Sequence, residues 1–126
     1  MAQRIFSGVP SEAIAGYAKA VIDGSTIYVS GTTGRDKTTG IFPTDAAQQA
    51  RNALAEIDDV LKKAGASLAH AVASRVYVTD LEAADAVTPV LGEVFKDIRP
   101  TSTFLICQIP ARGAKVEIEI IASVAQ

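Results

Sequence analysis

Glu117 and Glu119 are the residues of this sequence whose type and spacing best suit acid–base chemistry. They alternate with β-branched residues in the segment Lys115–Ala122, and a strand turns successive side chains to opposite faces, so the two carboxylates share one face. A strand this rich in β-branched residues is typical of a sheet interior, and its carboxylate face should look into a pocket or a subunit interface. A half-buried carboxylate there would have a raised pKa and act as a general acid or base, unless it only bonds the backbone or a neighbouring arginine.

Other residue types that support catalysis are scarce. His70 is the one histidine, and it follows a helix-ending turn without triad or metal partners nearby in the sequence, so we expect a solvated surface side chain. Cys107 is the one cysteine, and its place in an apolar run predicts a buried, unreactive thiol. These counts argue against a zinc site and exclude an intramolecular disulfide. Neither a metal nor a cofactor is expected.

Length and composition indicate one globular domain. The 126 residues suffice for a single hydrophobic core, so residues 1–126 are interpreted as one unit. Hydrophobic residues make up 48% and charged residues 21%, as in folded rather than disordered proteins. The net charge of −2 and the pI near 5.3 argue against a large basic surface, so no nucleic-acid partner is expected. No stretch suits a bilayer crossing or a signal peptide, which predicts a soluble cytoplasmic protein with no membrane partner.

The first third of the chain predicts a β-hairpin. Residues 4–7 are expected to form a short strand, and residues 8–11, with a glycine and a proline, break any regular pattern. Asp23 and Gly24 then separate two alternating apolar runs, which is the strongest local signal for a hairpin. Residues 31–40 are rich in glycine and threonine and predict a loop that lacks the spacing of a phosphate-binding loop.

The middle of the chain predicts a long helix followed by a strand. Asp45 can cap the helix, with Gln48 completing a reciprocal capping box. Apolar residues recur at helical spacing from there to Gly65, where the helix should end. Residues 71–79 alternate in the manner of a strand.

The last third predicts a second helical stretch and two strands. The stretch begins at Asp80 and closes at Arg99-Pro100, and Pro89 within it is interpreted as a first-turn proline behind a Thr88 cap. The final strands are expected at residues 103–107 and 115–122.

These elements predict an α+β domain with a single sheet of about six strands. Two helices can cover one face of such a sheet and no more. The other face, which carries Glu117, must then be hidden by further copies of the chain or left partly wet. A homo-oligomer follows as a hypothesis.

Seven short motifs occur along the whole chain. They are Ile14-Ala15-Gly16-Tyr17, Val29-Ser30-Gly31, Gln48-Gln49-Ala50, Ala64-Gly65-Ala66-Ser67-Leu68, Val76-Tyr77-Val78-Thr79-Asp80, Arg99-Pro100 and Val116-Glu117-Ile118-Glu119. No single motif is specific, but together, in this order and at these distances, they resemble the RidA (YjgF) family. The resemblance implies a chorismate-mutase-like fold and a homotrimer whose sheets line a central barrel, with small-ligand clefts between subunits.

The resemblance also implies an activity and its residues. Family members of the best-known type hydrolyse reactive enamines and imines to 2-oxo acids and ammonia. Glu117 matches the family's pocket glutamate, which orients or activates water or handles a proton, so we expect the catalytic role at Glu117 and a structural role at Glu119. Tyr17 and Ser30 match ligand-contacting positions, where hydroxyl groups can fix a polar substrate. Ser30 has no matched base and is not expected to be a nucleophile.

One position departs from the family pattern. The activity rests on an arginine that pairs with the substrate carboxylate, and counting back without gaps from Glu117 places Ser102 at that position. The fork that would hold a carboxylate at two points is therefore missing, as in arginine-less branches of the family. Four arginines remain as candidates for a relocated anion site, although a surface or interfacial ion pair is the simpler interpretation of each. They are Arg35, Arg75, Arg99 and Arg112, of which Arg35 and Arg112 lie nearest the matched site positions in sequence.

Three functions are consistent with this pattern. The first is a RidA-like hydrolase or deaminase acting on a small imine, enamine or related metabolite in an intersubunit cleft, with Glu117 handling water or a proton. The alternative is a trimer that binds a small metabolite without chemistry, which Ser102 in place of arginine favours. A ribonuclease, an activity attached to some relatives, is disfavoured by the acidic balance.

Overall fold

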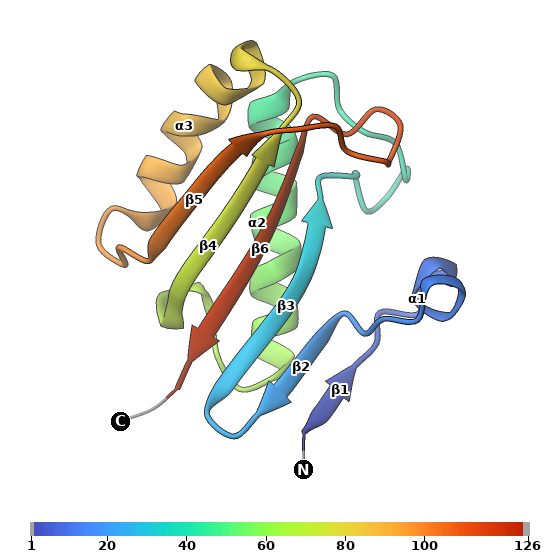
Figure 1. Ribbon diagram of the computed structural model, residues 1–126, viewed down its shortest axis with the longest axis vertical. Helices are drawn as coiled ribbons and strands as arrows, with labels where there is room; N and C mark the ends of the chain where they lie inside the picture. Colours follow the sequence, from blue (N-terminus) through green and yellow to red (C-terminus); the bar gives the residue numbers. More distant parts are fainter. Residues whose placement is uncertain (1, 125–126) are drawn as a thin grey trace.

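The computed structural model describes residues 2–124 and shows one layer of strands backed by helices (Figure 1). The strands are β1 (Gln3–Ile5), β2 (Ala20–Asp23), β3 (Thr26–Thr33), β4 (Ala71–Val78), β5 (Thr101–Ile106) and β6 (Val116–Ser123). The helices are α1 (Pro10–Ala15), α2 (Ala46–Lys63) and α3 (Leu81–Phe95), with a 3₁₀ turn at Leu68–His70. The predicted α+β fold with a single sheet is confirmed.

The sheet has the order β1-β2-β3-β6-β4-β5, so β6 lies in its middle. Neighbouring strands are antiparallel except β4 and β5, which are parallel and are joined by α3 as a crossover. This order places the carboxylate-bearing strand between β3 and β4, where both neighbours can contribute to a site.

The predicted hairpin is confirmed, and its second strand is longer than expected. Asp23 pairs with Thr26, and Gly24 takes a φ of +61° in the turn between them. Instead of ending at Gly31, β3 continues to Thr33 because it pairs with β6 again after a bulge between Val29 and Thr32. The bulge re-aims the side chains of the residues inside it.

The predicted start and end of α2 hold, with one exception. The Asp45 carboxylate accepts a hydrogen bond from the Ala47 amide at 3.0 Å, and α2 ends just before Gly65, whose φ is +83°. The expected reciprocal bond from Gln48 is wrong, because its side chain donates to Asn52 one turn further along the helix.

Pro89 does not start a helix. Asp80 caps α3 through a 2.7 Å bond from the Ala83 amide, and the helix runs through Pro89 to Phe95. Thr88 is therefore not a cap, and its hydroxyl donates to the Ala84 carbonyl at 2.8 Å. A proline removes one internal hydrogen bond, and packing of α3 against α2 and β4 outweighs that cost here.

A short helix, α1, occupies part of the segment that was expected to be irregular. Pro10 fits its first turn, where a missing amide hydrogen costs nothing. Glu12 is buried and accepts hydrogen bonds from the amides of Ser7 and Gly8, which fixes the approach to the helix. Gly16 ends α1 with a φ of +75°. Figure 1 shows α1 at the side of the sheet, apart from the other two helices.

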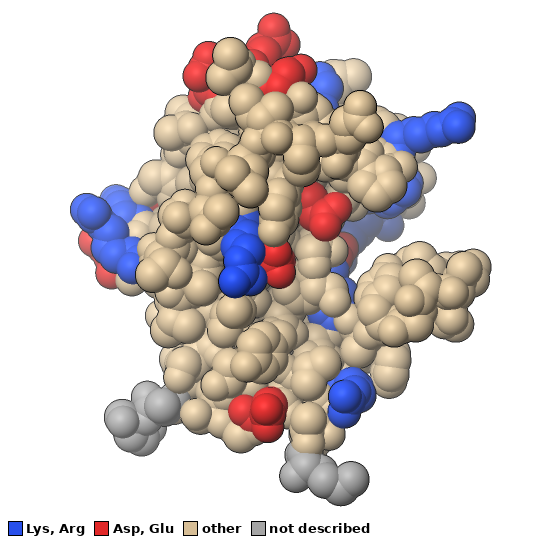
Figure 2. All heavy atoms as spheres, in the orientation of Figure 1, with Lys and Arg blue, Asp and Glu red and all other residues tan. Residues whose placement is uncertain are grey.

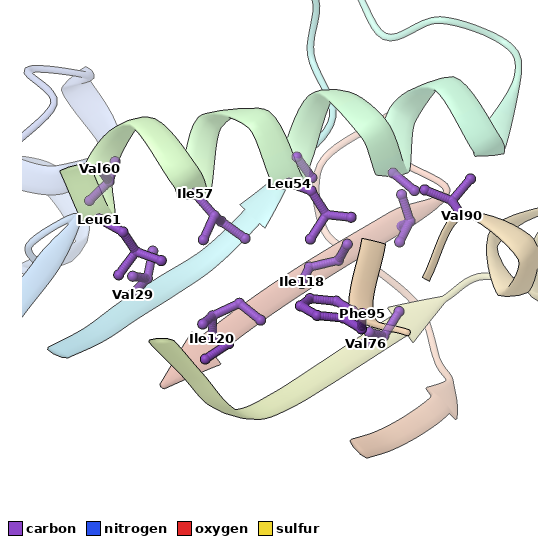
Figure 3. Close-up of a cluster of buried hydrophobic side chains, with 14 of the residues drawn as sticks. Val29, Leu54, Ile57, Val60, Leu61, Val76, Val90, Phe95, Ile118 and Ile120 are labelled. Carbon is purple, nitrogen blue, oxygen red and sulfur yellow. The ribbon is translucent and has the colours of Figure 1, made fainter. Parts of the chain in front are cut away.

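The core lies between the sheet and α2 (Figure 3). Ile57 and Leu61 of α2 are fully buried against Ile118 and Ile120 of β6 and Val76 of β4. Burying a side chain of this size contributes about 1.5–3 kcal/mol, so this layer fixes β6 firmly in place. The same alternation turns both glutamates of β6 to the opposite face.

The face of the sheet away from α2 and α3 is open in the single chain. Figure 2 shows that uncharged atoms cover most of it, with a few charged side chains near its middle. Tyr28 and Val72 are 46% and 48% exposed. The edge strand β5 is likewise uncovered, so Leu105 is 52% exposed and the prediction of a buried Cys107 thiol is wrong for this chain.

Candidate functional site

Glu117 lies in the middle of the sheet on the open face. It is directly opposite Tyr77 of β4 and Thr33 of β3. Its side chain is half-buried, and within residues 2–124 no hydrogen bond reaches its carboxylate. Burial raises the pKa of Glu117, the neighbouring Glu119 raises it further, and Lys19 acts in the opposite direction. The group is therefore a carboxylate that holds its proton more readily than usual.

Gly31 makes room for this carboxylate. The glycine lies in the β3 bulge beside β6, and a Cβ atom at this position would overlap Oε2 of Glu117. Its φ is not in the left-handed region, so space rather than backbone conformation requires a glycine. The bulge thus creates the place where the Glu117 carboxylate rests.

Glu119 is held by neighbours on the same face. It accepts a 2.6 Å hydrogen bond from the Tyr77 hydroxyl and forms a 3.7 Å ion pair with Arg75, which lies opposite it on β4. The hydrogen bond to Glu119 raises the pKa of Tyr77, followed by burial of the phenol. These contacts agree with the structural role expected for Glu119.

Two hollows meet at Glu117. The larger has a volume of about 1000 Å³ and lies between β3, α2 and the segment that carries α1. Figure 2 shows this hollow at the side of the molecule. We call it the α1 cleft. The smaller, of about 290 Å³, lies between Glu117, Tyr77 and the loop at Cys107–Pro110. Glu117 and Gly31 line both, so a ligand in either would contact this carboxylate.

The α1 cleft brings together four of the sequence-predicted site residues. Ser30 is fixed by a 2.6 Å bond from its hydroxyl to the Ala18 carbonyl, and the exposed Tyr17 shares a 2.6 Å hydrogen bond with Ser11. Arg35 stacks on the Phe42 ring at 4.4 Å and donates to the Gly40 carbonyl. The predicted residues that line the cleft are Tyr17, Ser30, Arg35 and Glu117.

Ser102 and Arg112 lie elsewhere in the single chain. Ser102 is exposed on β5 and pairs with Ser74 of β4, two strands from β6 and outside both hollows. Arg112 is exposed in the loop before β6 and also lines neither hollow. Their ligand-binding roles stay predictions, and Ser102 would need a neighbouring subunit to reach Glu117 of this one.

Lys19 is a cleft residue that the sequence reasoning missed. Its ammonium donates to Thr32 Oγ1 at 2.7 Å and to Glu56 of α2 at 2.6 Å. Thr32 in turn donates to the Ser30 carbonyl at 2.8 Å, and the Ser30 amide donates to the Lys19 carbonyl at 2.9 Å. These bonds fix Ser30 from both sides. No local pattern signals this, because Glu56 lies 37 residues further along the chain.

The cleft is balanced in charge and shows no arrangement typical of a metal site. Among residues 2–124, no three His, Cys, Asp or Glu side chains gather so that they could hold a metal ion. His70 is exposed, as predicted, and its Nδ1 accepts from the Ser67 amide. No helix in the same range is long and apolar enough to cross a membrane. The charged residues that line the cleft are the cations Lys19, Arg35, Lys37 and Lys63 and the acids Glu12, Glu56, Asp59 and Glu117.

Comparison with known proteins identifies relatives along nearly the whole chain. Residues 9–124 match the family model described as Endoribonuclease L-PSP. A protein from Capra hircus named 2-iminobutanoate/2-iminopropanoate deaminase is 33% identical over 97% of this chain and 90% of its own length. A RutC family protein from Drosophila melanogaster is 38% identical over 86% of this chain and 80% of its own length. The crystal structure of a YjgF/YER057c/UK114 family member from Mycobacterium tuberculosis is 37% identical, covers 98% of this chain and 100% of its own, and superposes with a TM-score of 0.88.

Proposed function

This chain belongs to the YjgF/RidA family, whose family model is described as Endoribonuclease L-PSP, and we propose that it is an imine deaminase. Its substrate would be a small 2-imino acid or the enamine that equilibrates with it. The products would be a 2-oxo acid and ammonia.

The observation that carries this proposal is the state of Glu117. A half-buried carboxylate without a hydrogen-bond partner in the described chain, with a raised pKa, lies where two hollows meet. Perturbed carboxylates in clefts are typical of general acids and bases. The names of the Capra hircus and Bos taurus relatives, both 2-iminobutanoate/2-iminopropanoate deaminases, support the reaction class.

The proposed reaction uses one water molecule. With the imine nitrogen protonated, the Glu117 carboxylate accepts a proton from water as the oxygen attacks the imine carbon, which gives a neutral carbinolamine. Glu117 then returns this proton to the nitrogen. As the carbon–nitrogen bond breaks, Glu117 accepts the proton of the carbinolamine hydroxyl, so that the carbonyl forms and ammonia leaves. An enamine would first take a proton at its terminal carbon to become the imine. Ser30 and Tyr17 would position the substrate, and the raised pKa lets one group both take and give the proton.

We further propose that the working unit is a homotrimer. The open sheet face leaves Tyr28 and Val72 about half exposed, and β5 leaves Leu105 uncovered, which is costly in water. Neighbouring copies would cover this face and enclose Glu117, and a neighbour could bring Ser102 to the cleft. A trimer would elute at about three times the 13.1 kDa chain mass.

A metabolite-binding trimer without chemistry is the second candidate, because of one observation. Ser102 cannot supply the charged fork that an arginine would offer a carboxylate at this position. Nucleic acid remains the least suitable ligand, since four carboxylates balance the four cations of the α1 cleft and would repel a phosphate backbone.

The test is ammonia release from freshly generated 2-iminopropanoate and 2-aminoacrylate. Wild type, Glu117→Ala and Ser102→Arg are compared at equal concentration. We expect activity in the wild type and its loss in Glu117→Ala. Activity only in Ser102→Arg would show that the cleft serves another ligand and would favour the binding protein. No activity in any variant would contradict the deaminase.

A further inference from the structure

Lys19 is the single buried cation among residues 2–124, with 7% of its surface exposed. It lies just before β2 and lines the α1 cleft together with Ser30 and Glu117. A buried ammonium acts in a medium of low dielectric, where its attraction for an anion is stronger than at the surface. The chain pays a desolvation cost to keep this charge in the cleft.

The other cations of the cleft are less suited to hold an anion. Lys37 forms a 2.8 Å ion pair with Asp59, and both side chains are more than half exposed. Arg35 is exposed and stacked on Phe42. Lys63 is exposed in the last turn of α2. Water and salt screen such charges, so they contribute little to a specific contact.

The contacts of Lys19 leave capacity for a ligand. An ammonium has three N–H donors, and the bonds to Thr32 and Glu56 use two of them. The Glu56 side chain is 35% exposed and stays hydrated, whereas the Lys19 side chain is 9% exposed. An anion that enters the cleft therefore meets an ammonium group that is less hydrated than its carboxylate partner, Glu56.

The charge of Lys19 also reaches Glu117. Burial and Glu119 raise the pKa of Glu117, and among residues 2–124 Lys19 is the one cation that counteracts them. The two groups line one cleft, which thus offers both an ammonium and a proton-accepting carboxylate. A small molecule with a carboxylate next to an imine carbon is complementary to this pair.

We propose that Lys19 binds the carboxylate of the ligand in this cleft and replaces the arginine that is absent at Ser102. The assignment rests on the proposed function in naming a small 2-imino or 2-oxo acid as ligand. It predicts that a single ammonium contact, held by Thr32 and Glu56, orients the acid with its second carbon toward Glu117.

The test is binding of 2-oxobutanoate, an unreactive carboxylate of the product type, to the full chain by ligand-detected NMR. Its neutral amide serves as the matched probe. The variants are Lys19→Met, the double variant Lys19→Met/Glu56→Gln and the control Lys96→Met, which removes an exposed cation at the end of α3 that lines neither hollow. The double variant removes both charges of the pair, so it keeps the test valid if Lys19→Met alone leaves an unpaired Glu56 and fails to fold.

We expect both Lys19 variants to lose about tenfold to hundredfold in affinity for 2-oxobutanoate, as for a hydrogen bond to a charged group, with amide binding unchanged. Lys96→Met should bind both probes as the wild type does. Equal losses of affinity for the acid and the amide would show that Lys19 only maintains the structure of the cleft, and would overturn the assignment. Unchanged acid binding, or a wild type that binds neither probe, would overturn it too.

The same proteins separate this assignment from the proposed function. A wild type that binds 2-oxobutanoate through Lys19 but releases no ammonia from 2-iminopropanoate would refute the deaminase and leave the Lys19 site standing. A wild type that releases ammonia while the Lys19 variants keep their affinity for the acid would support the deaminase and refute the Lys19 site.

Discussion

The two glutamates of β6 stand two residues apart on one face and have different surroundings. Glu119 accepts a hydrogen bond from Tyr77 and pairs with Arg75. Glu117 has no such bond within residues 2–124 and rests beside Gly31 at the edge of the α1 cleft. The same side chain on the same strand thus has hydrogen-bonding partners in one place and none among residues 2–124 in the other.

The difference shows that neighbours decide what a carboxylate can do. Partners that donate hydrogen bonds stabilise the ionised form and fix the group in place. Burial without partners raises the pKa and leaves lone pairs to accept a proton from water. Gly31 in the β3 bulge contributes to this difference, because a Cβ atom at that position would overlap the Glu117 carboxylate, and its absence leaves room for that group.

Among the substitutions described in this and the following three paragraphs, Gly31→Ala should have the largest effect. The new methyl group would displace the Glu117 carboxylate, which is the flexible end of a side chain, so the fold should tolerate it. A displacement of about 1 Å at a catalytic group costs up to about a hundredfold in rate. We expect kcat for ammonia release to fall roughly tenfold to hundredfold, with an unfolding free energy within about 1 kcal/mol of wild type.

Gly92→Ala is the matched control for this prediction. Gly92 lies in α3 with open space around it, so the same chemical change meets no neighbour. Its rate should equal that of the wild type, and its stability should rise slightly because alanine favours the helix. A Gly31→Ala enzyme that is as fast as Gly92→Ala would show that the resting place of Glu117 is irrelevant to the reaction.

A smaller effect, on stability, is expected for Tyr77→Phe. The change removes the 2.6 Å hydrogen bond to Glu119 and leaves the ring in place. Loss of this hydrogen bond should lower the unfolding free energy by about 1 kcal/mol in urea denaturation. The remaining Arg75 ion pair is long and partly exposed, so it does not compensate for the lost bond. The rate of ammonia release should stay within about threefold of wild type. A loss of rate comparable with that of Gly31→Ala would assign chemistry to the Glu119 side as well.

The smallest effect is a dependence of stability on pH that belongs to Glu117. Its pKa is raised in the folded chain above the ordinary value of 4.5, so the folded protein binds this proton more tightly than the unfolded chain does. Ionising Glu117 therefore costs stability as the pH rises through and above 4.5, and below that value the cost vanishes. Glu117→Gln should be slightly more stable than wild type at pH 7 and equal to it near pH 4 in denaturant titrations. A variant that is less stable at pH 7 would mean that Glu117 is held by a favourable partner in the assembled protein.

Sequence patterns predict the parts of this fold that depend on local chemistry. The alternation in β6, the Asp23-Gly24 turn, the Asp45 cap and the start of a helical stretch at Asp80 all have short-range causes, and each is confirmed. They suffice to turn Glu117 toward the open face. The RidA resemblance is confirmed by the family match over residues 9–124.

Features that depend on distant neighbours are not predictable in this way. The burial of Lys19 requires Glu56 from α2, and the role of Gly31 requires a bulge that only the pairing of β3 with β6 reveals. Cys107 looked buried because its surroundings are apolar, yet it follows the exposed edge strand β5. Pro89 looked like a helix start because a proline inside a helix removes a backbone hydrogen bond, which is a local effect. The packing of α3 offsets this loss, but it involves residues distant in the sequence.

We propose that Glu117, and not Glu119, carries the chemistry of this cleft. One assay tests it directly: ammonia release from freshly generated 2-iminopropanoate by wild type, Glu117→Gln and Glu119→Gln, each shown to be folded by its thermal transition. General acid–base catalysis is worth about 10²–10⁴-fold, so Glu117→Gln should lose at least about a hundredfold in kcat while Glu119→Gln stays within about tenfold of wild type. Equal rates for Glu117→Gln and wild type, or a greater loss in Glu119→Gln, would contradict the account.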